Sequence, residues 1–126
     1  MTQTRPASSA LLDLRLALEQ PPADQPVPDA WRWVVRKHLA GVRDQLAHEG
    51  AHPQDAGLAA RDGALLRERD ALLRRLVALG HPLLSDPEVE PVRTELRRLA
   101  ADIAHHEQRL HDLVFDDIEL ELGGSE

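Results

Sequence analysis

The sequence predicts an all-α fold, an antiparallel up-and-down four-helix bundle with one short and three long helices. Strong helix formers, chiefly Leu, Ala, Arg and Glu, dominate the 126 residues. Aromatic residues, which sheets favour, make up only 2% of the chain. Clusters of proline and glycine separate four segments with helical apolar spacing, and short connections make consecutive helices antiparallel neighbours. No internal repeat is apparent.

The length predicts one domain. We divide it into a disordered N-terminus (residues 1–8), a helical bundle domain (residues 9–118) and a flexible acidic tail (residues 119–126). The first helix is expected from about Ala10 to Gln20, with Ser8 or Ser9 as its N-cap. Its leucines are spaced along one stripe: Leu11, Leu14 and Leu18. Four prolines then forbid helix and predict a stiff connector over residues 20–28.

The second helix is expected from about Ala30 to Glu49, after Asp29 as its N-cap. The third is expected from about Gly57 to Leu79. Gly80 stands where a left-handed C-cap residue belongs and Pro82 follows it, so the third helix is predicted to end there.

The fourth helix is predicted to start near Asp86, with Pro87 in its first turn. Its continuous part is expected from about Glu90 to Ile118. A second proline, Pro91, is a candidate break in this helix.

Composition excludes several classes of chemistry. The chain has no cysteine, so disulfides, thiolate metal sites and a cysteine nucleophile are excluded. It lacks a signal peptide and an apolar run of membrane-spanning length, which favours a cytoplasmic protein with no membrane role. There is no glycine-rich phosphate loop and no serine elbow, so a non-enzymatic role is favoured. The net charge of -7 argues against nucleic acid as a partner.

Two features predict a protein partner or self-association. The stretch from Asp112 to Glu126 carries six acidic residues and no base, and could steer a basic partner. The first helix is too short to cover three long helices fully, which would leave an apolar strip through which two copies could dimerise.

Each long helix also carries ionisable residues on or near its apolar stripe. They are His38 and Glu49 in the second helix, Asp62 and Arg69 in the third, and His106 and Asp117 in the fourth. Buried charges are costly unless they are paired or bound to a metal. Two explanations stay open: pairing across helices, with the histidines hydrogen-bonded, or convergence of His and carboxylate groups on a metal in the bundle core.

The segment from His105 to Asp116, HHEQRLHDLVFD, resembles the last helix of hemerythrin-like (HHE cation-binding) proteins. The likeness is closest to small actinobacterial members, in which a His precedes an Asp-Leu-Val-aromatic-acid run and a terminal Gly-Gly. The Trp31-Arg32-Trp33 start of the second helix and the Leu-Arg-rich third helix are also similar, so the likeness spans about residues 29–124. The resemblance implies a four-helix bundle with a non-haem di-iron site that binds oxygen or senses redox state.

The ligands of such a site carry over only in part. His106 matches the histidine of the last helix, and His38 stands for the lone histidine of an early helix. The third helix has no histidine, and Asp70 occupies a position where the family often has one. The resemblance therefore implies a reduced or lost metal site, with His38, His106 and His111 as the candidate ligands and iron as the candidate cofactor.

Three functions follow as hypotheses. The first is a hemerythrin-like bundle with a reduced or lost metal site that acts in sensing, assembly or partner binding. The second is a working non-haem iron protein that binds oxygen or senses redox state. The third is a metal-free dimeric interaction module.

Overall fold

The structure, a computed structural model, describes residues 7–20, 29–48 and 63–124, with side chains described from Ser9 and as far as Asp112. Within these ranges it contains α1 (Ala7–Leu18), α2 (Asp29–His48), α4 (Gly63–Ser85) and α5 (Val89–Gly124), and no strand. The predicted all-α class is confirmed. None of these helices is both long enough and apolar enough to span a bilayer.

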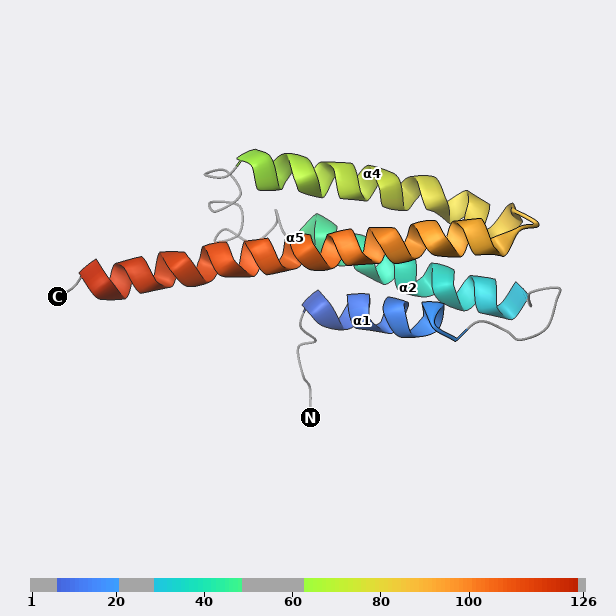
Figure 1. The fold of residues 1–126 in the computed structure, drawn as a ribbon, viewed down its shortest axis with the longest axis horizontal. Coiled ribbons are helices and arrows are strands. Elements are labelled where there is room, and N and C mark those ends of the chain that lie inside the picture. Colours follow the sequence, from blue (N-terminus) through green and yellow to red (C-terminus); the bar gives the residue numbers. More distant parts are fainter. Residues whose placement is uncertain (1–6, 21–28, 49–62, 125–126) are drawn as a thin grey trace.

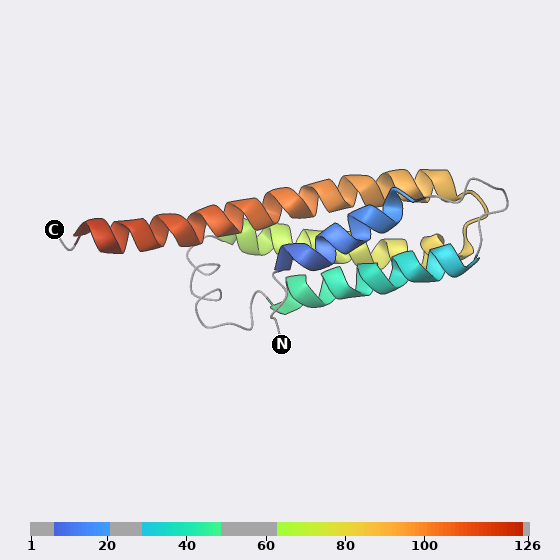
Figure 2. The same cartoon turned by 90° about the horizontal axis from the view of Figure 1, so that it is seen from below.

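The four helices form a closed ring of neighbours. α1 packs against α2 and α5, and α4 packs against the same two helices. Consecutive helices run in opposite directions (Figures 1 and 2), which confirms the up-and-down bundle. Branched aliphatic side chains from all four helices fill the centre, among them Leu11, Leu14, Leu18, Val35, Val42, Leu46, Leu72, Leu76, Leu83, Leu96, Leu99 and Ile103.

The first helix is shifted relative to the prediction. α1 begins at Ala7 and ends at Leu18, so positions 8 and 9 lie inside the helix and the predicted N-cap at Ser8 or Ser9 is wrong. The three predicted core leucines of this helix are at most 4% exposed. Residues 1–6 and 21–28 lie outside the described ranges, so the disordered N-terminus and the stiff connector stay predictions.

The predicted end of the third helix at Gly80 is wrong. α4 continues through Gly80 and Pro82 to Ser85, and Gly80 does not have a left-handed backbone. Pro82 removes one helical hydrogen bond, a cost of about 3 kcal/mol in a helix interior. Leu83 is fully buried, and its carbonyl accepts a hydrogen bond from another helix. Because both contacts require the helix to continue, packing outweighs the local stop signal.

Gly80→Ala is therefore expected to raise the free energy of unfolding by about 0.5–1 kcal/mol, because alanine restricts the unfolded chain more than glycine does. A Cβ atom at this position would meet no atom within 4 Å. Urea unfolding followed by circular dichroism measures the change. A destabilisation of about 1 kcal/mol or more would instead show that Gly80 is the left-handed cap that the sequence predicts.

The last helix is continuous across Pro91. α5 begins at Val89, which places Pro91 in the first turn, where backbone N–H groups have no partner within the helix. Just before it, the Glu88 backbone N–H donates to Asp86 Oδ1 at 2.9 Å. The helix then runs to Gly124, beyond the expected end at Ile118 and beyond the ends of the other described helices (Figures 1 and 2). The flexibility of the acidic tail stays a prediction.

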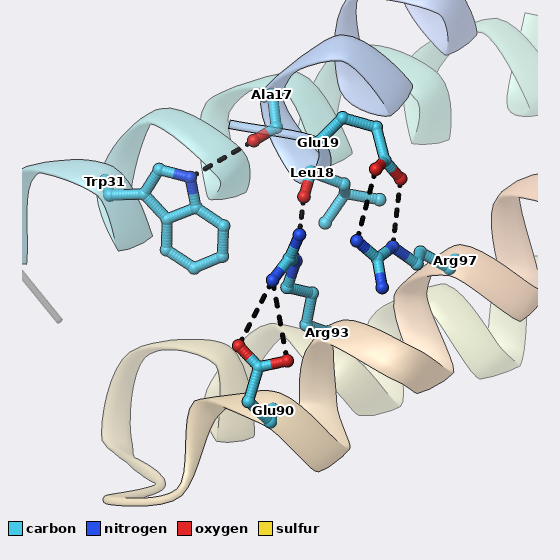
Figure 3. A network of polar contacts seen from close by, with 7 residues as sticks. All are labelled: Ala17, Leu18, Glu19, Trp31, Glu90, Arg93 and Arg97. Atoms are coloured by element: carbon cyan, nitrogen blue, oxygen red, sulfur yellow. Dashed lines mark hydrogen bonds and ion pairs between the residues drawn. The ribbon is translucent and has the colours of Figure 1, made fainter. Parts of the chain in front are cut away.

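Two buried arginines cap helix ends at one end of the bundle. Arg93, 8% exposed, donates from Nε to the carbonyl of Leu18 at 2.8 Å (Figure 3). Arg32, also 8% exposed, donates to the carbonyl of Leu83 at 2.8 Å. The last carbonyls of a helix lack partners within that helix and carry partial negative charge, so a cation is stabilising there. Each arginine thus ties the start of one helix to the end of a neighbour.

The same end of the bundle carries two further contacts to α1. Trp31 donates from Nε1 to the carbonyl of Ala17 at 3.1 Å, and Glu19 accepts two hydrogen bonds from Arg97 at 2.9 and 3.2 Å (Figure 3). The indole adds a second donor to this end carbonyl of the short helix, which also accepts from the Gln20 backbone N–H at 3.3 Å. Side chains of α2 and α5 therefore fix where α1 ends.

The two arginines stand at the same spacing from buried aliphatic residues of their own helices. In α2, buried Val35 and Val42 follow Arg32 by three and ten residues, and in α5 buried Leu96 and Ile103 follow Arg93 at the same spacing. In both helices the arginine therefore stands one turn before the buried apolar stripe.

Candidate functional site

His106 is a buried histidine in contact with a carboxylate of another helix. Its side chain is 1% exposed, and Nδ1 lies 2.7 Å from Oε1 of Glu68 in α4. Arg109, one turn further along α5, forms an ion pair with the other carboxylate oxygen of Glu68. We call His106, Glu68 and Arg109 the His106 cluster. The predicted position of His106 near the core edge is confirmed, and the structure adds its cross-helix partner.

The His106 cluster can hold the imidazole ring in one orientation. A carboxylate beside Nδ1 fixes which ring nitrogen carries the proton, and the arginine balances the carboxylate charge. Metal centres need more donors, since protein zinc sites use three or four side chains. In the described part of the chain, no three His, Asp or Glu side chains come together in a group able to hold a metal ion.

The three candidate ligands do not form such a group with one another. His38 is half-buried on α2, and His111 is exposed on α5. Along α5, His111 lies about 7.5 Å beyond His106 at 1.5 Å per residue. Metal binding by any of the three histidines stays a prediction.

Only part of the predicted cross-helix pairing falls on described side chains. Arg69 lies 3.5 Å from Asp70 of its own helix, and the residue that reaches from α4 to α5 is Glu68. The predicted pairing of Arg69 across helices is therefore not observed among the described residues. The other predicted partners, Glu49, Asp62 and Asp117, lie outside the described side chains.

A surface groove runs between α2 and α4. Its volume is about 260 Å³. It combines an apolar floor with three basic side chains, and none of its lining residues is acidic. The lining residues are Arg36, Leu39, Ala40, Arg43, Leu76, Val77, Gly80, His81 and Leu84. We call this feature the α2–α4 groove.

Two exposed arginines give the α2–α4 groove its charge. Arg36 and Arg43 are seven residues apart, about two helical turns, so they stand on the same side of α2. Within the described ranges, neither forms an ion pair with an acidic side chain. In an acidic chain, two such cations on one rim make a local site of attraction for carboxylates.

Val77 adds exposed apolar surface to the α2–α4 groove. Its side chain is 61% exposed, and beside it Gly80 has no side chain. This groove was not predicted from the sequence, because a third helix that ends at Leu79 leaves His81 and Leu84 outside the helix. The seven-residue spacing of the two arginines, together with a valine off the apolar stripe, is the signal that could have found it.

A second surface hollow lies between α4 and α5, and its charges differ from those of the α2–α4 groove. Its two arginines are paired with acids of the same hollow: Arg75 with Asp102 at 2.7 Å, and Arg109 with Glu68. These charges neutralise one another. The α2–α4 groove is therefore the stronger candidate for binding a charged partner.

Comparison with protein-family models, with curated proteins and with solved structures gave no match for this chain. The resemblance of residues 105–116 to hemerythrin-like proteins accordingly stays a prediction drawn from those residues.

Proposed function

We propose that the chain is a protein-interaction module whose α2–α4 groove binds an acidic, amphipathic helix of a protein partner. The observation that carries the proposal is the combination of an apolar floor with Arg36 and Arg43 on one rim. In helix-in-groove recognition, apolar side chains at i, i+4 and i+7 spacing enter the groove. Carboxylates beside them would pair with the two arginines.

This function retains the assembly or partner-binding role expected from the sequence, and it does not depend on a hemerythrin-like origin.

Non-haem iron binding is the second candidate function. What favours it is the buried His106 beside Glu68, since His and carboxylate donors from facing helices build the metal sites of bundle cores.

A synthetic helical peptide tests the groove directly. The peptide carries leucines at helical i, i+4 spacing and glutamates beside them, and isothermal titration calorimetry measures its affinity for the full chain at low salt. The Arg36→Glu, Arg43→Glu variant reverses both charges, so two exposed ion pairs with the peptide become two repulsions. We expect a loss of binding free energy of about 2 kcal/mol, which weakens binding roughly 10- to 30-fold. Binding should also weaken as salt is added.

A matched control separates the groove from general attraction. Arg15→Glu, Arg67→Glu makes the same charge change at two exposed arginines outside the groove lining. This variant should bind the peptide within about threefold of the unmodified chain. Equal weakening by the two double variants would contradict a binding site at the α2–α4 groove.

A further inference from the structure

The end of α5 is an acidic helix that projects beyond the other described helices (Figures 1 and 2). From residue 112 to residue 124 it is about 20 Å long at 1.5 Å per residue. In the sequence, Val114, Ile118 and Leu122 recur every four residues, the spacing of an apolar helix stripe, and this stretch has acids but no base. Acidic residues around an apolar repeat are the pattern that the α2–α4 groove requires of its partner.

The charged residues of the two helices also match in their spacing along the sequence. Arg36 and Arg43 are seven residues apart on α2, and Asp112 and Glu119 are seven residues apart on α5. Seven residues of helix span about 10 Å. Two cations and two anions of equal separation can therefore pair in one register.

We propose that the α2–α4 groove binds residues 112–124 of a second copy of this chain, and that two copies do so reciprocally in an antiparallel dimer. The inference rests on the proposed function of the groove. A chain cannot fill its own groove, because α5 is one continuous helix whose end projects beyond α2 and α4, the two helices that line the groove (Figure 1). In the proposed antiparallel dimer each helix end lies in the other copy's groove, and two equal contacts close the assembly.

Charge exchange tests this arrangement on the full chain. The groove variant is Arg36→Glu, Arg43→Glu, and the helix-end variant is Asp112→Arg, Glu119→Arg. Analytical ultracentrifugation measures the dimer dissociation constant of the unmodified chain, of each variant, and of an equimolar mixture. Each variant alone sets like charges against each other and should dimerise at least about tenfold more weakly. In the mixture both contacts are again between opposite charges, so dimerisation should return to within about threefold of the unmodified chain.

The mixture also controls for folding, because restored dimerisation requires both variants to be folded. An unmodified chain that stays monomeric at millimolar concentration would overturn the inference. So would dimerisation that persists in both variants, or a mixture that restores nothing. If the chain is monomeric while the groove still binds the synthetic acidic peptide, the proposed function stands and the occupant is another acidic protein.

Discussion

Replacing Arg93 with alanine should lower the free energy of unfolding by about 2–4 kcal/mol. Arg93 is 8% exposed, and its Nε donates to the Leu18 carbonyl at 2.8 Å. Removing it leaves an end carbonyl of α1 without its cation and removes the packing of the arginine stem. Urea unfolding followed by circular dichroism measures the loss.

Arg98→Ala is the matched control for this prediction. Arg93 and Arg98 each pair with a glutamate three residues earlier, at 3.2 and 3.0 Å, but the Arg98 side chain is 69% exposed. An exposed ion pair of this kind is worth about 0.5 kcal/mol, so the control should change stability by no more than that. Equal effects of the two substitutions would mean that the cap on α1 contributes nothing and that only the surface pair matters.

Leu14→Ala should cost about 3 kcal/mol, within the range for leucine-to-alanine changes that leave a cavity. Leu14 is fully buried, and it lies in the short α1. A large loss would show that α1 is a full member of the core and does not merely rest on the other three helices. Thermal and urea unfolding together give the change.

Leu12→Ala provides the comparison on the same helix. Leu12 lies two residues before Leu14 and is 55% exposed. Its truncation removes little packing and should change the free energy of unfolding by about 0.5 kcal/mol or less. If both leucines gave the same small change, the packing of α1 against α2 and α5 would be contradicted.

The fold was largely predictable because leucine spacing identifies helices and their inner faces. Leu11, Leu14 and Leu18 were placed on one stripe and are buried together. The helix ends were less predictable. Gly80 and Pro82 are strong local stop signals, but the burial of Leu83 outweighs them, and that burial depends on residues far away in the sequence.

The candidate site was predictable only in part. The position of His106 near the core edge followed from helical spacing, whereas its partner Glu68 did not, because the rotation of α4 against α5 decides which carboxylate reaches the ring. The α2–α4 groove combines residues of two helices. The seven-residue spacing of Arg36 and Arg43 marks a basic side of α2, but the sequence does not show that Val77 lies beside it, so only part of this surface was predictable.

Mapping the bound peptide by nuclear magnetic resonance tests most directly whether the α2–α4 groove is a binding site. Two-dimensional amide and arginine side-chain spectra of the full chain would be recorded while the synthetic acidic helix is added. We expect the largest shifts at residues 36–43 of α2 and 76–84 of α4, with the Nε signals of Arg36 and Arg43 among them. Shifts centred instead on the exposed Leu12 and Leu16 of α1, or no shifts with a peptide of confirmed helicity, would contradict the groove as the binding surface.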